Sequence, residues 1–142
     1  MNSAKEYLQQ VKSCETRIKR IREKLQNLED QVQKITPLLS PSGGGGGGKD
    51  PLGDAVAGIA DLKSTLVEEI NRRNALVAEA TELLGKIRSE SQYDILFRRY
   101  MLFHSWGQIM DEMHYSSKDS VFKLHKRALR TVEKLLKEKS VQ

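Results

Sequence analysis

Hydrophobic residues recur through the first 36 positions of the chain in alternating steps of three and four. They are Ala4, Tyr7, Val11, Cys14, Ile18, Ile21, Leu25, Leu28, Val32 and Ile35. This spacing is the a/d heptad pattern, which predicts one long α-helix with a narrow apolar seam over about residues 3–36. We expect Ser3 and Glu6 to form a capping box at its start. Cys14 should be a small buried residue of the seam, and Tyr7 should keep its hydroxyl in water.

Proline and glycine residues interrupt the pattern over residues 37–50. Thr36-Pro37 predicts the end of the helix, because proline disfavours the helical conformation of the residue before it. The segment then contains Pro41, the six glycines Gly43–Gly48 and Asp50-Pro51. A phosphate-binding loop needs a preceding strand and a Gly-Lys-Ser/Thr sequence, and this segment has neither. We therefore expect a flexible loop, either native or engineered.

A second helical pattern extends from Asp50 or Asp54, as N-cap, to about Arg88. Its apolar positions keep mostly to one face and are Ile59, Leu62, Leu66, Ile70, Val77, Leu84 and Ile87. The two predicted helices are close in length, so we predict that they pair as an antiparallel, coiled-coil-like hairpin over residues 1–90. The alternative is a homodimer in which the first helix pairs with its own copy and brings Cys14 against Cys14.

Residues 91–142 carry three further helix signals. The three-residue spacing of a capping box occurs in the pairs Ser91/Asp94, Ser105/Gln108 and Ser116/Asp119. The first pair predicts a helix over residues 92–102. The other two predict a short helix after Ser105 and a longer helix after Ser116, separated by a tight turn.

Each of the last two predicted helices has one apolar face. It consists of Trp106, Ile109, Met110 and Met113 in the first and of Val121, Leu124, Ala128, Val132 and Leu135 in the second. Lysine and arginine occupy the other face of the second helix. A short helix, a tight turn and a basic helix are typical of a helix-turn-helix, whose second helix enters the major groove of DNA. The chain is therefore predicted to be all-α, with the hairpin followed by a helix-turn-helix domain in residues 91–142.

The start of the last helix and its basic face supply the predicted DNA contacts. These are Ser116, Ser117, Lys118, Ser120, Lys123, Lys126, Arg127 and Arg130. We expect the serines and lysines at the start of the helix to face bases, and Lys126, Arg127 and Arg130 to meet phosphates. The competing interpretation is a solvated, lysine-rich helix that binds nothing.

Three strings in this region, YDILFRRY, SWGQIMDEM and VFKLHKRALRTVEKL, resemble the fourth region of bacterial sigma factors. The same strings also resemble the late transcription regulators of Gram-positive phages. The likeness covers about a third of the chain. It departs from the pattern at Met110, where a small residue is usual, and in a turn that is longer by one residue. The resemblance implies a phage or prophage transcription regulator that binds promoter DNA, with RNA polymerase as a second candidate partner near Asp111-Glu112.

Composition and charge agree with a cytoplasmic DNA-binding protein. The net charge is +5, and residues 114–142 hold eight Lys and Arg against three Asp and Glu, so this segment alone accounts for the whole excess. A concentrated positive charge favours an anionic partner, most commonly nucleic acid. The sequence contains no apolar run long enough to span a membrane and no apolar core of a signal peptide. A single cysteine cannot form an internal disulfide.

Nothing in the sequence predicts an enzyme. His104, His114 and His125 are too scattered for a metal site, and long helices with a small terminal domain leave little room for a concave active site. We therefore expect no catalytic residues, no cofactor and no metal. The alternative to a DNA-binding regulator is a coiled-coil adaptor, such as a phage packaging or assembly protein, that uses the helix-turn-helix for protein contacts.

Overall fold

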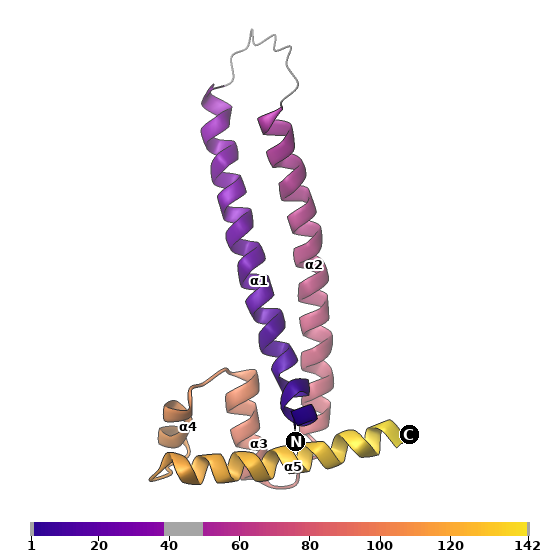
Figure 1. Ribbon diagram of the computed structural model, residues 1–142, viewed down its shortest axis with the longest axis vertical. Coiled ribbons are helices and arrows are strands. Elements are labelled where there is room, and N and C mark those ends of the chain that lie inside the picture. The colour runs from indigo at the N-terminus through magenta and orange to yellow at the C-terminus, as the bar shows by residue number, and fades with distance from the viewer. Residues whose placement is uncertain (1, 39–49, 142) are drawn as a thin grey trace. The chain divides into compact units, whose positions relative to one another are not determined.

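The computed structural model describes residues 2–38 and 50–141, which contain helices and no β-strand. The all-α prediction is therefore confirmed for this part of the chain (Figure 1). Two helices are long, α1 (Asn2–Ile35) and α2 (Pro51–Leu84), and three follow them, α3 (Glu90–Leu96), α4 (Trp106–Glu112) and α5 (Lys118–Val141). The predicted loop residues Pro41 and Gly43–Gly48 lie outside the described residues. The chain divides into two compact units, residues 1–14 with 73–142 and residues 15–72.

The start of α1 differs from the predicted capping box of Ser3 and Glu6. Ser3 lies inside the helix, and its hydroxyl donates to a carboxylate oxygen of Glu133 on α5. The other oxygen of Glu133 accepts the backbone N–H of Ala4 at 3.1 Å. The first N–H groups of a helix have no partner within it, so a carboxylate from elsewhere takes the role that the local cap was expected to have.

The predicted seam of α1 is confirmed: every described heptad residue is buried or half-buried, and Cys14 is fully buried. The expectation for Tyr7 is wrong. Its hydroxyl is buried without a hydrogen-bond partner among the described residues, and burial raises its pKa, with Glu79 as a second cause. The heptad pattern also missed Leu8, which is fully buried in the core of its unit. At this end of α1 the buried face is wider than an a/d seam.

Local residues set the ends of the two long helices. A short 3₁₀-helix, η1 (Thr36–Leu38), follows α1 at the predicted Thr36-Pro37 break. Asp50 is the N-cap of α2, since its Oδ1 accepts the N–H of Gly53 at 2.9 Å and Pro51 occupies the first helical position. The helix ends at Leu84, before the predicted Arg88, because glycine at position 85 favours termination and 3₁₀-type bonds follow it.

In the unit formed by residues 15–72, side chains of α1 and α2 contact each other. Nε of Arg17 lies 3.3 Å from a carboxylate oxygen of Glu69. A Cβ atom added to Gly58 would lie 3.2 Å from Cδ1 of Leu28, so the Leu28 side chain packs against the α2 backbone at this point. The apolar contacts of this unit include the buried residues Ile18, Leu25 and Ala55.

The other unit has a larger core, to which every helix that enters it contributes. The buried residues are Ala4 and Leu8 of α1, Leu83 and Leu84 of α2, Ile95, Leu96 and Tyr100, Ile109 of α4, and Val121, Leu124, Ala128, Leu129 and Val132 of α5. The predicted apolar stripe of α5 is confirmed through Val132, with Leu135 half-buried at its edge. Burial of the four stripe residues leaves the basic face of α5 exposed.

The helix predicted for residues 92–102 begins earlier and changes type. Ser89, not Ser91, is the N-cap of α3, because its Oγ accepts the N–H of Gln92 at 3.3 Å. A π-helix, η2 (Phe97–Met101), follows, in which the N–H of Leu102 bonds to the carbonyl of Phe97 at 3.0 Å. Such insertions change the direction of successive side chains and occur often at functional sites.

None of the helices within residues 2–38 and 50–141 combines the length and apolar character needed to cross a membrane.

Candidate nucleic-acid interface

The start of α4 matches the predicted capping box. Oγ of Ser105 accepts the N–H of Gln108 at 3.2 Å, and the side-chain oxygen of Gln108 accepts the N–H of Ser105 at 2.9 Å. The backbone N–H groups of Ser105 and Gln108, which have no partner within the helix, therefore both find an acceptor in the local sequence. The cap holds Trp106 in the first turn of the helix and directs Ile109 into the core.

His114 forms the turn between α4 and α5. It has a φ of 61°, its N–H bonds to Asp111, and the N–H of Tyr115 bonds back to the carbonyl of Met110 at 2.9 Å. This is a Schellman ending with histidine in the left-handed position usually taken by glycine. Histidine adopts that conformation more readily than most side chains, so the turn is sharp without a glycine.

The N-cap of α5 is Ser117, one residue later than the predicted Ser116. Its Oγ accepts the N–H of Ser120 at 3.3 Å and lies 3.1 Å from the hydroxyl oxygen of Ser120. Asp119 was expected to complete a capping box, but it lies 3.3 Å from Nζ of Lys123, one turn later. Ser116 therefore stays in the turn, outside the helix.

All eight predicted DNA-contact residues lie in the turn or on α5 up to Arg130, and none of them belongs to the core stripe. Seven are exposed: Ser116, Ser117, Lys118, Lys123, Lys126, Arg127 and Arg130. Ser120 is half-buried, with its hydroxyl engaged by Ser117. The ion pair of Lys123 with Asp119 has side chains 74% and 77% exposed, so water and salt screen it strongly. A phosphate or a base can therefore compete for Lys123 at little cost.

Trp106 lies at the edge of the core, in contact with an aromatic group on α5. Its ring makes edge-on contacts with Phe122 and His125, with centroid separations of 5.3 Å and 4.7 Å. The guanidinium of Arg99 lies 4.3 Å from the Trp106 ring centre, a cation–π contact. Arg99 also donates to the carbonyl of His104 at 3.0 Å. Together these contacts fix the start of α5 against α4.

The sequence left two roles open for His125, contact with phosphate or a place over the core. The structure places it over the core, where its Nε2 lies 2.7 Å from the hydroxyl of Tyr100. Burial lowers its pKa to about 4, with Lys5 and Arg99 as further causes. The imidazole is therefore neutral at pH 7, and a neutral ring offers no charge to a phosphate.

Successive residues of η2 contact different parts of the segment that follows. Arg98 pairs with Asp94 at 3.1 Å and with Glu112 at 3.2 Å, while Arg99 and Tyr100 reach Trp106 and His125. Glu112 also lies 2.8 Å from Nδ1 of His104. Glu112 therefore joins α4 to η2 while it remains exposed.

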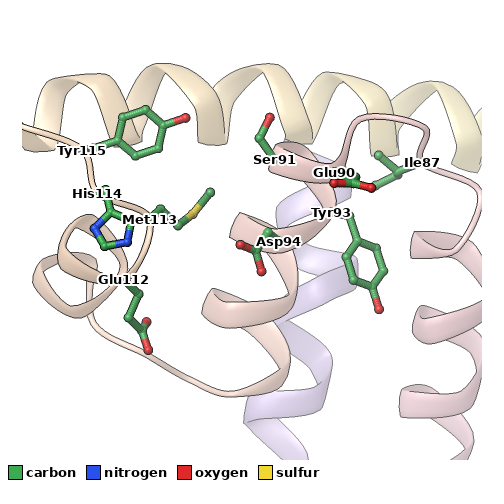
Figure 2. Close-up of a pocket in the computed structure, with 9 residues that line it drawn as sticks. All are labelled: Ile87, Glu90, Ser91, Tyr93, Asp94, Glu112, Met113, His114 and Tyr115. Carbon is green, nitrogen blue, oxygen red and sulfur yellow. The ribbon is translucent and has the colours of Figure 1, made fainter.

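An open pocket of about 710 Å³ lies between α3 and the end of α4, and Figure 2 shows its lining. The residues are Ile87, Glu90, Ser91, Tyr93, Asp94, Glu112, Met113, His114 and Tyr115. Three of them are carboxylates, and none is among the eight predicted DNA contacts. An acidic lining repels phosphate, so this pocket does not suit a nucleic-acid backbone.

The described residues contain no group of three or more His, Cys, Asp or Glu side chains placed to hold a metal ion. His114 lines the acidic pocket, whereas His125 packs under Trp106.

Sequence reasoning missed two residues of this region, Arg99 and Phe122. Arg99 lies in the string YDILFRRY, and its contact with Trp106 depends on the π-helix, which has no clear sequence signal. Phe122 is 44% exposed, although it is a large apolar residue. Its position off the three-four stripe of α5 was a signal that it would not lie in the core.

Comparison of the chain with protein-family models, curated proteins and solved structures finds no match.

Proposed function

We propose that this protein is a DNA-binding transcription regulator in which α4 and α5 act as a helix-turn-helix and α5 lies in the major groove of promoter DNA. The observation that carries the proposal is the two-sided character of α5. One face buries Val121, Leu124, Ala128 and Val132, and the other exposes lysines and arginines, where the Lys123–Asp119 pair near the helix start is strongly screened. If α5 were only a solvated helix that binds nothing, the capped and closely packed short helix α4 before it would have no role.

The register of α5 supports different roles for its basic residues. Ser117 caps the helix, so Lys118 and Lys123 lie in its first two turns, the part that enters a groove first in proteins of this kind. Lys126, Arg127 and Arg130 follow over the next turn and are the proposed phosphate contacts. In the sigma-like interpretation the regulator is phage or prophage encoded, works in the bacterial cytoplasm and has RNA polymerase as a second partner.

We also propose that α1 and α2 form an intramolecular antiparallel hairpin that carries the DNA-binding part. Support comes from the Arg17–Glu69 pair and from the close approach of Gly58 to Leu28 within residues 15–72. In this arrangement the heptad seam is covered by the same chain, and a partner copy is not needed to exclude water from it.

The alternative of a coiled-coil adaptor is favoured by one observation. Val56 and Val67 of α2 are 52% and 57% exposed, and apolar side chains on an outer helix face suit protein contacts. An adaptor of this kind would bind its partners whether or not DNA is present.

Selection from a random double-stranded DNA pool with the full chain tests the proposal. We expect enrichment of one sequence motif and its loss in the double variant Lys126→Glu/Arg130→Glu. The matched control is Lys19→Glu/Lys24→Glu on α1, which changes the net charge equally at two exposed positions and should keep the motif. Failure of the wild-type chain to retain DNA, together with protein partners that survive nuclease treatment, would favour the adaptor.

A further inference from the structure

Phe122 is an exposed aromatic side chain among positive charges. Its exposed fraction is 44%, and it lies within the second turn of α5. Lys118 and Lys126 are one turn before and one turn after it, so the three share one strip of the helix surface. The neighbouring stripe residues Val121 and Leu124 already fill the core. Phe122 therefore lies outside the core, and its contact with Trp106 leaves the side chain partly exposed.

The Phe122 ring is held in place by a rigid support. Its inner side meets the Trp106 ring edge-on at 5.3 Å. Trp106 is held in turn by the Arg99 guanidinium at 4.3 Å and by the His125 ring at 4.7 Å. A side chain fixed in this way loses little conformational entropy when a partner covers its outer side.

The charges around Phe122 decide which partner fits. Lys118, Lys123 and Lys126 are all exposed, and the pair of Lys123 with Asp119 is strongly screened. Such a surface repels a basic protein and attracts DNA. The edge of the major groove offers one prominent apolar group, the C5-methyl of thymine, and phenylalanine is among the side chains that contact it.

We propose that Phe122 is a specificity-determining residue that packs against the C5-methyl group of a thymine in the bound site. This inference rests on the proposed DNA-binding function and extends it, because none of the polar residues assigned to bases can distinguish thymine by its methyl group. The lysines then supply attraction to the backbone and to purine edges, and Phe122 supplies an apolar preference at one step of the site.

Replacement of thymine by deoxyuridine tests the proposal, because it removes only the methyl group. Each thymine of the selected site is replaced in turn, and affinity is measured by fluorescence anisotropy at fixed salt. With the wild-type chain we expect about a fourfold loss at one or two positions, the effect of uncovering one methyl group. Phe122→Ala should bind thymine and deoxyuridine equally at those positions, and Phe122→Leu should keep part of the difference.

The control variant is Leu102→Ala, which also removes an exposed large apolar side chain, 46% exposed, and should keep the full discrimination. Wild-type binding to the selected site with no effect of deoxyuridine at any position would overturn the role of Phe122 and leave the proposed function standing. Retained discrimination in Phe122→Ala would overturn it too. Equal binding of the wild type to selected and random DNA would instead show that the proposed function itself fails.

Discussion

The hydroxyl oxygen of Tyr100 lies 2.7 Å from Nε2 of His125, and this contact joins the π-helix η2 to α5. Burial raises the pKa of Tyr100 to about 12 and lowers that of His125 to about 4. Both groups are therefore neutral at pH 7, and one proton shared in the contact satisfies the two polar atoms at the edge of the core.

Acid should destabilise the domain through His125. Its pKa in the folded state, about 4, is below its usual value of 6.5, so the unfolded chain binds more protons between these values. The contribution of the neutral His125 to the free energy of unfolding is fully present above about pH 6.5. It is lost as the pH falls toward 4. Urea unfolding at several pH values should show this loss in the wild-type chain and a weaker one in His125→Gln.

His114→Asn serves as the control for that experiment, because His114 is exposed and asparagine also adopts the left-handed conformation of this turn. It should reproduce the pH dependence of the wild type. An unchanged pH dependence in His125→Gln would contradict the buried, neutral state of His125.

Trp106→Ala should destabilise the C-terminal part of the chain by about 3 kcal/mol, the low end of the range for large aromatic residues in cores. The low end applies because Trp106 is half-buried, although it contacts Phe122, His125 and Arg99. Urea unfolding followed by circular dichroism measures the change. A decrease in the free energy of unfolding below about 1 kcal/mol would show that the Trp106 ring does not stabilise the domain.

The buried faces of the helices were predictable because periodicity alone determines them. Steps of three and four identify the seam of α1 and the stripe of α5 whatever covers them. The Ser105–Gln108 cap was also predictable, since both partners lie within one turn. Leu8 was not, because its burial depends on residues far away in the sequence that widen the covered face at this end of α1.

The errors at helix starts have the same origin. Ser116 and Ser117 are equally good cap residues by sequence. The Schellman turn at His114 extends the connection by one residue, so Ser117 becomes the cap. Ser3 has the sequence features of an N-cap residue. In the structure, however, the carboxylate of Glu133, far away in the sequence, accepts the N–H of Ala4 in its place. The π-helix could not be predicted from the sequence either, because the residues FRRY do not differ in composition from those of an α-helix. The contact of Arg99 with Trp106 could not be predicted for that reason.

Lys118 and Arg130 should differ in their effect on DNA binding. Lys118→Ala should cost about 1–3 kcal/mol at the selected site and change the preferred sequence, as expected for a base contact. Arg130→Ala should weaken binding to selected and random DNA alike. Titration of each variant with both DNAs makes the comparison, and equal losses on both DNAs for both variants would reverse the assignment of Lys118.

Cys14 should resist oxidation and thiol reagents in the native chain, because it is fully buried in the seam of α1. Mild oxidation should therefore give no crosslinked dimer on a non-reducing gel. The control places a cysteine at the exposed neighbouring position, Ser13→Cys in a Cys14→Ser background, where a thiol reagent should react at once. Ready Cys14–Cys14 crosslinking would support the parallel homodimer over the intramolecular hairpin.

The salt dependence of DNA affinity tests the central claim most directly. Each phosphate neutralised by a lysine or arginine adds about −0.9 to the slope of log K against log salt concentration. Contacts by Lys126, Arg127 and Arg130 predict a slope of about −2.7 or steeper between 50 and 200 mM salt. The account predicts this slope for the wild-type chain and a shallower one for Arg130→Ala. No measurable binding at 50 mM salt, or an affinity that does not change with salt, would contradict it.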